Sequence, residues 1–196
     1  MEPLLEAKAR LRAAAKRARA AAFARQGTNA AARLADHGLA FADPPRDGVV
    51  SGFSAIGEEI DPFRLLARLA RDGGRICLPV MQGKGLPLLF KSWRPGDPTK
   101  AAVWGINEPL ASAPAVEPDV LLVPLLAFDA LGYRLGYGGG FYDRTIAELR
   151  GHKPVITIGV AFDEQRVDSV PHTSYDQRLD WVLTPSGPAF TGVSRS

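Results

Sequence analysis

The segment 119–150 constrains the fold of this chain more than any other. Asp119–Pro124 is apolar on both faces, which is typical of a parallel strand that helices cover on both sides. Five glycines follow within the nine residues 132–140, and the pattern of Phe141–Arg150 predicts a helix directly after them. A buried strand that leads through a loop into a helix is the repeating unit of α/β folds with parallel sheets.

The rest of the chain repeats this alternation. Apolar stretches predict further strands, and stretches rich in Ala, Leu and Arg predict helices. The expected strands are 48–53, 75–80, 88–93, 154–162 and 180–184, and the expected helices are 2–25, 28–41 and 63–72. We therefore expect one α/β domain over residues 1–196, a three-layer α/β/α sandwich with a largely parallel sheet, preceded by a helical arm over 1–41. Residues 94–118 contain five prolines and are expected to be irregular, and 186–196 to form a loose tail.

Composition excludes several classes of protein. With 46% hydrophobic and 23% charged residues, the chain of 196 residues can bury a core without disulfides or structural metals. The single cysteine, Cys77, cannot form a disulfide within the chain, which predicts a buried strand thiol in a reducing, cytoplasmic setting. No apolar run reaches the roughly 18 residues of a membrane span, and the basic N-terminus lacks the apolar stretch of a signal peptide. We expect a monomer without a membrane partner.

Positive charge is concentrated near the N-terminus. Residues 1–33 hold eight basic and two acidic side chains, a net charge of +6, whereas the remainder carries −3 within an overall charge of +3. Such an arm can meet an anionic ligand. Nucleic acid is one candidate, but Phe23 is the only aromatic residue among these bases, and no RNA-binding signature is present. We therefore expect no nucleic-acid partner.

The glycine-rich loop is a candidate phosphate site. A loop of this kind before a helix directs several backbone N–H groups and the positive end of the helix dipole towards one point. Arg134 adds a fixed cation that can bind two phosphate oxygens at once. The alternative is a tight turn without a ligand, which is weaker because three consecutive glycines cost folding entropy that a simple turn does not require. Neither the Gly-Lys-Ser/Thr of a P-loop nor the third glycine of GxGxxG is present.

Three further groups of charged side chains have two interpretations each. Asp143, in the first helical turn, either complements the helix dipole or holds Mg²⁺ beside the phosphate site. Lys8 and Arg12, four residues apart on one helix face, either reach nucleotide phosphates or form a solvated face. Glu58 and Glu59 follow a strand end, where open α/β sheets bind ligands, and either accept N–H donors of a heterocycle or are solvated loop acids. The histidines show neither metal-ligand spacing nor a hydrolase triad.

Taken together, these motifs resemble those of one family. The stretch Arg134–Arg144 reads Arg-Leu-Gly-Tyr-Gly-Gly-Gly-Phe-Tyr-Asp-Arg, and with the preceding 123–129 it resembles the signature of 5-formyltetrahydrofolate cyclo-ligase, also called 5,10-methenyltetrahydrofolate synthetase. Lys8–Arg12, Glu59–Asp61 and Tyr175–Thr184 are similar to further elements of the family in the same order. The resemblance therefore covers nearly the whole chain.

The resemblance implies an ATP- and Mg²⁺-dependent enzyme of one-carbon metabolism. Its substrate would be 5-formyltetrahydrofolate, with or without a polyglutamate tail, and its products 5,10-methenyltetrahydrofolate, ADP and phosphate. In the family mechanism the formyl oxygen attacks the γ-phosphate, N10 then attacks the formyl carbon, and phosphate leaves. Phosphoryl transfer of this kind asks a protein mainly for positioning and charge neutralisation.

The resemblance also assigns roles to residues. Arg134, Tyr142 and Asp143 would lie at the reacting groups, and Asp143 and Asp176 would hold Mg²⁺. Asp180, in the last motif, is expected to have a structural role. The residues implied to bind ATP are Lys8, Arg12, Arg134, Leu135, Gly136, Tyr137, Gly138, Gly139, Gly140, Phe141 and Tyr142. Those implied to contact the folate are Ser54, Glu59, Trp104, Tyr137 and Phe141.

Two positions depart from the family pattern. Gly139 stands where some members carry Lys, and Tyr137 stands where others carry Arg. A phosphate contact is therefore either missing or supplied by Lys8, and the charge on the folate side is in question. Two alternative functions stay open: a paralogue that acts on another formylated or heterocyclic amide, and a nucleotide- or RNA-binding module without catalysis.

Overall fold

The computed structural model describes residues 3–192, apart from the side chain of Trp104. The helices are α1 (Leu4–Gln26), α2 (Asn29–His37), α3 (Phe63–Arg71) and α4 (Phe141–Arg150), with short 3₁₀ helices η1 (Ala40–Ala42), η2 (Val103–Gly105) and η3 (Asp163–Gln165). The strands are β1 (Val49–Ser51), β2 (Arg75–Met81), β3 (Leu88–Ser92), β4 (Thr99–Ala101), β5 (Asn107–Pro109), β6 (Val120–Pro124), β7 (Ala127–Phe128), β8 (Arg134–Leu135), β9 (Ile156–Val160), β10 (Trp181–Thr184) and β11 (Gly187–Phe190).

Seven of these strands form the central sheet, in the order β11-β10-β9-β6-β1-β2-β3. The five strands from β10 to β2 are parallel, and β11 and β3 pair antiparallel at the two edges. Parallel strands need crossover connections, and α3 connects β1 to β2 while α4 leads into β9. The predicted largely parallel sheet is confirmed.

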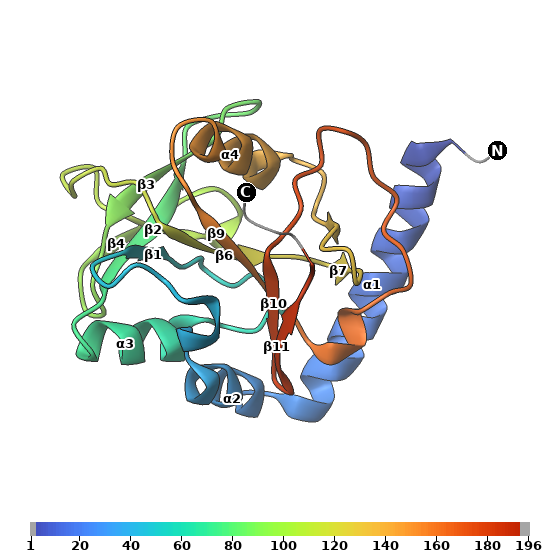
Figure 1. Ribbon diagram of the computed structural model, residues 1–196, viewed down its shortest axis with the longest axis horizontal. Coiled ribbons are helices and arrows are strands. Elements are labelled where there is room, and N and C mark those ends of the chain that lie inside the picture. The colour runs from blue at the N-terminus through green and yellow to red at the C-terminus, as the bar shows by residue number, and fades with distance from the viewer. Residues whose placement is uncertain (1–2, 193–196) are drawn as a thin grey trace.

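Helices cover both faces of the sheet, with α2 and α3 on one face and α4 on the other (Figure 1). Along β6, Val120 and Leu122 belong to the core beneath α2 and α3, whereas Leu121 and Val123 pack with Ile146 of α4. This alternation follows from strand geometry, because successive side chains point to opposite faces. The predicted three-layer α/β/α sandwich is confirmed.

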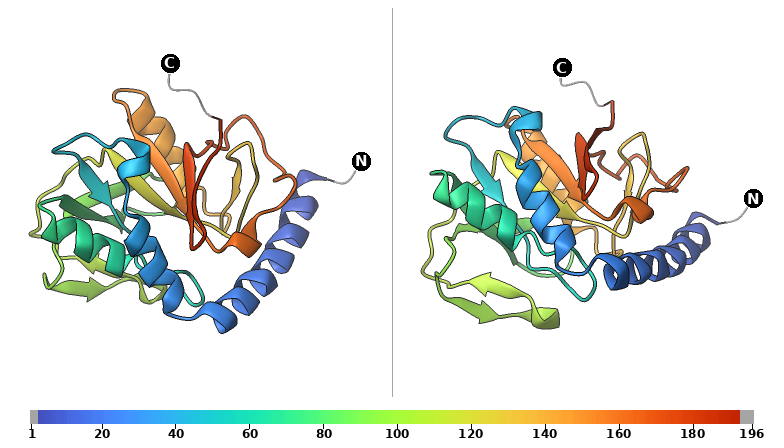
Figure 2. Two further views of the ribbon diagram at one scale, coloured as in Figure 1. Left: turned by 60° about the horizontal axis from the view of Figure 1, so that its bottom comes forward. Right: turned by 90° about the horizontal axis from the view of Figure 1, so that it is seen from below.

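Helix α1 lies beside the sandwich rather than in one of its layers (Figures 1 and 2). It contacts η3 and β7, and Ala15 packs with Leu126 and Leu135. Its buried side chains are Ala15, Arg19 and Ala22, so that two small residues flank a single buried arginine. The small side chains bring the helix backbone close to the loops that it contacts.

The helical arm differs from the prediction at its second helix. Helix α2 ends at His37 rather than at Phe41, because Gly38 follows with a φ of 62° and caps the helix. Residues 40–42 form the separate helix η1. Since α2 also packs into the main core through Leu34, only α1 stands out as an arm.

Residues 94–118 and the C-terminal tail are more regular than predicted. Strands β4 and β5 form an antiparallel ribbon in which Thr99 faces Pro109. Because the ribbon has only two strands, both are edge strands, where proline is tolerated. Strand β11 pairs with β10, and the ring of Phe190 lies 4.8 Å from that of Trp181. The predictions of an irregular stretch and of a loose tail are therefore wrong for these strands, while 193–196 lie outside the described residues.

Cys77 lies in β2 with its side chain fully buried. Burial raises the pKa of its thiol to about 12, so the reactive thiolate does not form near neutral pH. The predicted buried strand thiol is confirmed. Within residues 3–192, no helix has the length and apolar character needed to cross a bilayer.

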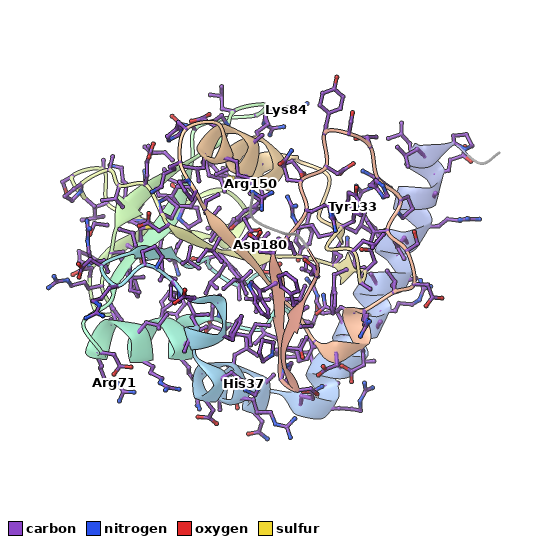
Figure 3. All side chains as sticks on the ribbon, viewed as in Figure 1. His37, Arg71, Lys84, Tyr133, Arg150 and Asp180 are labelled. Atoms are coloured by element: carbon purple, nitrogen blue, oxygen red, sulfur yellow. The ribbon has the colours of Figure 1, made fainter. Side chains whose placement is uncertain are left out.

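Asp180, which directly precedes β10, connects that strand to β9 through hydrogen bonds. Its carboxylate accepts hydrogen bonds from the N–H of Thr157 at 2.7 Å and from the hydroxyl of Thr157 at 2.8 Å, and lies 3.2 Å from Arg150 (Figure 3). Because Asp180 is buried, Asp180→Ala would leave these donors unpaired. We expect the variant to lower the free energy of unfolding by about 3 kcal/mol in urea titrations. Alanine at the exposed Asp168 serves as control; equal losses in both variants would contradict the structural role of Asp180.

Candidate active site

The glycine-rich loop follows a short β-ribbon at the carboxyl end of β6. Strands β7 and β8 pair antiparallel, and Asp129 closes their turn by accepting the N–H groups of Leu131 and Tyr133, both at 3.0 Å. Residues 136–140 then lead directly into α4. The ribbon holds the start of the loop and α4 holds its end. Since the ribbon follows the carboxyl end of β6, the loop lies at the edge of the sheet where α/β proteins bind ligands.

Backbone geometry accounts for several of the glycines. Gly138 and Gly140 have φ values of 100° and 66°, which L-amino acids rarely adopt. At Gly139, a Cβ atom would lie 2.8 Å from the ring of Phe141, so a larger residue at this position would require the ring to shift. The loop ends at the N-terminus of α4, where the first N–H groups of a helix can bind an anion.

Arg134 and Asp143 form an ion pair beside the loop. Arg134 Nη2 lies 2.8 Å from Asp143 Oδ1, and Arg134 also donates to the backbone carbonyl of Gln177. The same Oδ1 accepts the N–H of Gln177 at 2.9 Å. Only 4% of the Arg134 side chain is exposed, against 29% for Asp143. Burial lowers the pKa of Arg134, and the two nearby carboxylates of Asp143 and Asp176 oppose this effect.

Lys8 of α1 pairs with Asp176 on the opposite end of the chain. Lys8 Nζ lies 2.9 and 2.8 Å from the two carboxylate oxygens. Asp176 also accepts the N–H and the hydroxyl of Thr173, at 2.7 and 2.9 Å. Burial alone would raise the pKa of Asp176, but these hydrogen bonds and the Lys8 charge hold it below its usual value. The neighbouring Gln177 binds Asp143, and both carboxylates lie within electrostatic range of Arg134, so the two aspartates belong to the same part of the site.

Arg12 lies one helical turn beyond Lys8 and contacts the glycine-rich loop itself. Its Nε donates to the carbonyl of Gly136 at 3.0 Å. A Cβ at Gly138 would lie 3.5 Å from its guanidinium group, so Arg12 spans the middle of the loop. Lys8 and Arg12 thus both face the protein, and the interpretation as a solvated helix face is wrong.

Glu59 and Tyr137 connect the loop with a second part of the site. Glu59 lies beyond β1, is only 6% exposed, and accepts the N–H of Ile56 at 2.8 Å and the hydroxyl of Tyr137. Arg19 of α1 donates to the same hydroxyl, and its guanidinium lies 3.6 Å from the Glu59 carboxylate. Burial raises the pKa of Glu59, while Tyr137, Ile56 and Arg19 act in the opposite direction. The interpretation of Glu59 as a solvated loop acid is wrong.

Ser54 and Trp104, which are also implied to contact folate, lie in other segments of the structure. The hydroxyl of Ser54 donates to the carbonyl of Asn107 at 2.8 Å, which ties its loop to β5. Trp104 lies in η2, and its side chain is outside the described part of the structure. Neither placement supports the assigned role, which stays a prediction for both.

The aromatic residues after the loop lie in different surroundings. Phe141 lies beneath Arg144, whose guanidinium carbon is 5.4 Å from the ring centre. Tyr142 packs against the core on the α4 side of the sheet, and burial raises the pKa of its hydroxyl. Leu135, also implied to bind ATP, is buried in β8 against the arm. The side chains of Tyr142 and Leu135 therefore support the site from within the core.

Two cations at the site were missed in the sequence analysis. Arg144 donates to the carbonyl of Gly139 at 2.7 Å, so a positive charge lies beside the middle of the loop. Arg19 donates to the hydroxyl of Tyr137, so a second positive charge lies beside the start of the loop. The signal for Arg19 was present in the sequence, because it recurs with Lys8 and Arg12 at spacings that place all three on one helix face.

Comparison with known proteins identifies the family. The sequence profile of the 5-formyltetrahydrofolate cyclo-ligase family matches residues 5–185. The chain belongs to this family. The matched range of residues includes the inner face of α1, the glycine-rich loop and both aspartates.

Individual cyclo-ligases are similar over most of their length. The 5-formyltetrahydrofolate cyclo-ligase of Mycolicibacterium smegmatis is 38% identical over 144 residues, which cover 69% of this chain and 73% of its own. That of Haemophilus influenzae is 32% identical, covering 88% of this chain and 95% of its own. The NMR structure of Aquifex aeolicus 5,10-methenyltetrahydrofolate synthetase covers 96% of this chain and 95% of its own with a TM-score of 0.73. At 23% identity, that likeness supports the fold.

The carboxylate donors at this candidate site are of the kind that holds Mg²⁺ together with phosphate. Within residues 3–192, no three His, Cys, Asp or Glu side chains are grouped to hold a metal ion. Mg²⁺ commonly needs fewer, since it keeps water and phosphate ligands besides one or two carboxylates. Asp143 offers Oδ2, which accepts no hydrogen bond from the described residues. Among the described residues, Asp176 Oδ1 accepts a hydrogen bond only from Lys8, so it keeps capacity for a metal ion, although the positive charge of Lys8 competes with one.

Proposed function

We propose that this protein catalyses the ATP- and Mg²⁺-dependent cyclisation of 5-formyltetrahydrofolate to 5,10-methenyltetrahydrofolate, with release of ADP and phosphate. The observation that carries the proposal is the position of Tyr137. It lies in the glycine-rich loop next to Gly136, which binds Arg12, while its own hydroxyl binds the buried Glu59. A candidate phosphate site and a candidate site for an N–H-bearing heterocycle therefore meet at one residue.

The phosphate side would be formed by Lys8, Arg12 and Arg134. Each of them is bound to a carboxylate or a carbonyl of the protein. A triphosphate offers these cations several charge-assisted hydrogen bonds at once, so ATP could take the place of Asp176 and of the Gly136 carbonyl as their partner. Release of Lys8 would in turn remove its donor from Asp176 Oδ1, in the same part of the site as Asp143.

Asp143 and Asp176 are the residues proposed to hold Mg²⁺. When bound, the ion would neutralise negative charge on the phosphates during transfer. The residues themselves contribute fixed positions: Asp143 is held by Arg134 and Gln177, and Asp176 by Thr173. This arrangement asks no side chain to act as a nucleophile.

The proposed reaction has two bond exchanges. The formyl oxygen of the substrate attacks the γ-phosphorus, and the bond from that phosphorus to ADP breaks. N10 then attacks the formyl carbon and loses its proton to solvent, while the carbon–oxygen bond breaks and inorganic phosphate departs. Glu59, with Tyr137 and Arg19 around it, would accept N–H donors of the pterin and thereby hold the formyl group towards the loop.

The alternative of an RNA-binding module has less support. Lys8 and Arg12 bind other parts of this protein, and Arg19 is buried. The inner face of α1 is thus engaged with the site, whereas an RNA-binding surface needs cations that reach a phosphate backbone. The cytoplasmic location and the monomeric state stay predictions.

Turnover of the folate tests the proposed function directly. We expect purified protein with ATP, Mg²⁺ and 5-formyltetrahydrofolate to generate the absorbance of the methenyl product and one ADP per product, and to generate neither when ATP is omitted. No absorbance at micromolar enzyme would contradict the proposal. ADP release with another formylated or heterocyclic amide, and none with the folate, would instead support the paralogue.

A further inference from the structure

The inner face of α1 carries a third cation, Arg19, besides the two cations proposed to bind phosphate. Lys8, Arg12, Ala15 and Arg19 recur at spacings of three and four residues, so they lie along one face of the helix. With a rise of 1.5 Å per residue, Arg19 lies about 16 Å from Lys8 along the axis. This offset takes Arg19 past the candidate phosphate site and brings it to Glu59.

Burial of Arg19 is costly, and its hydrogen bonding is incomplete. The residue is 5% exposed, and its Nε is buried without a hydrogen-bond partner among the described residues. Its other nitrogens reach the hydroxyl of Tyr137 and, at 3.4 and 3.6 Å, the carboxylates of Glu58 and Glu59. An unpaired buried donor reduces stability, and such groups are rare outside functional sites. The position of Arg19 therefore points to a role in the site.

The donors and acceptors in this cluster have a single consistent arrangement. A guanidinium group can only donate, so Tyr137 accepts a hydrogen bond from Arg19. The hydroxyl hydrogen of Tyr137 is then directed to Glu59 Oε1, while the N–H of Ile56 binds Oε2. Each carboxylate oxygen thus has one protein donor and keeps capacity for another. Two such oxygens can accept a pair of N–H groups from a planar heterocycle.

We propose that Arg19 is a positioning residue for the folate side of the site: acting through Tyr137, it orients Glu59 and keeps it an anion that accepts paired N–H donors. The proposal rests on the proposed function. Arg19 acts on Glu59 and not on the reacting atoms.

The charges around Glu59 set the direction of the expected pH effect. Arg19 lies on one side, and Tyr137 donates to it from the loop. Glu58 competes for Arg19, and Tyr142 lies within electrostatic range of Glu59. Without Arg19, the remaining neighbours do not offset burial by an opposite charge, so the pKa of Glu59 rises further and its anion requires a higher pH.

The test compares Arg19→Met with the wild type. We expect KM for 5-formyltetrahydrofolate to rise about tenfold or more, and KM for ATP to change less than threefold. The acid limb of kcat/KM for the folate should move to higher pH by about one unit, because this profile reports groups of the unliganded enzyme. Arg19→Lys should return both quantities part of the way, and Tyr137→Phe should shift the limb in the same direction as Arg19→Met.

Arg17→Met is the matched control, because Arg17 lies on the exposed side of the same helix. It should leave both KM values and the pH profile unchanged. An Arg19→Met profile that coincides with the wild type overturns the proposal, as do equal losses for both substrates that Arg19→Lys does not relieve. If Arg19→Met does not fold, Tyr137→Phe tests the proposal, because the acid limb of its kcat/KM profile should also move to higher pH. Wild-type protein without any turnover would contradict the proposed function itself, and this role with it.

Discussion

Asp143→Asn is expected to lower kcat about a thousandfold while the protein stays folded. The substitution keeps the shape of the side chain, and the remaining oxygen can still accept hydrogen bonds from Arg134 and the N–H of Gln177. What changes is Oδ2, which becomes an NH₂ group that cannot bind Mg²⁺. The loss of charge beside Arg134 should cost only about 1–2 kcal/mol of stability, because the hydrogen bonds persist and the nearby Asp176 carboxylate still offsets the Arg134 charge.

Three measurements decide the Asp143→Asn prediction: kcat, the Mg²⁺ concentration at half-maximal rate and the urea unfolding midpoint. The half-maximal Mg²⁺ concentration should rise about tenfold or more if Asp143 holds the ion. Asp97→Asn is the matched control, since Asp97 is an exposed acid whose carboxylate accepts the N–H of Arg94 in its own turn. Wild-type turnover and Mg²⁺ dependence in Asp143→Asn would remove Asp143 from the proposed site.

Features with a local cause could be predicted from the sequence. Strand β6 is apolar on both faces because helices cover both sides of the sheet. The glycines at 138 and 140 are required where φ is positive, and α4 begins directly after them. Lys8 and Arg12 share a helix face by simple periodicity, and Glu59 follows a strand end. Each inference needed only a few neighbouring residues and one rule of backbone geometry.

Pairings between distant segments could not be predicted in the same way. Lys8 meets Asp176 across 168 positions, and no local rule connects an arm helix with a turn before the last parallel strand. Likewise, the segment that contains Phe190 pairs with β10, where its ring contacts that of Trp181. The local sequence of this segment predicted only a loose tail. The helix face on which Arg19 lies could be predicted, but its contact with the buried Glu59 could not, because the two residues are 40 positions apart.

Arg134→Met is expected to lower kcat by about a thousandfold and the free energy of unfolding by about 3 kcal/mol. Only 4% of this side chain is exposed, and its loss removes the cation that holds Asp143 and the carbonyl of Gln177. The carbonyl of Gln177 and the partly buried carboxylate of Asp143 would both lose this donor, and the packing of the long side chain would change. Arg134→Lys retains the charge but not the planar fork, so we expect a loss of only about a hundredfold in kcat. Steady-state assays and urea titration at the same temperature separate the two effects.

Combining Arg134→Met with Asp143→Asn distinguishes one unit from two independent contributions. If the pair works as a unit, the double variant should lose about a thousandfold in kcat, like either single variant; independent contributions would multiply to about a millionfold. Stability gives a second criterion, because the double variant leaves no unpaired charge and should be more stable than Arg134→Met. A millionfold loss in kcat would show that Arg134 acts on the phosphates separately from Asp143. Equal stability of Arg134→Met and the double variant would show that their ion pair contributes little to the fold.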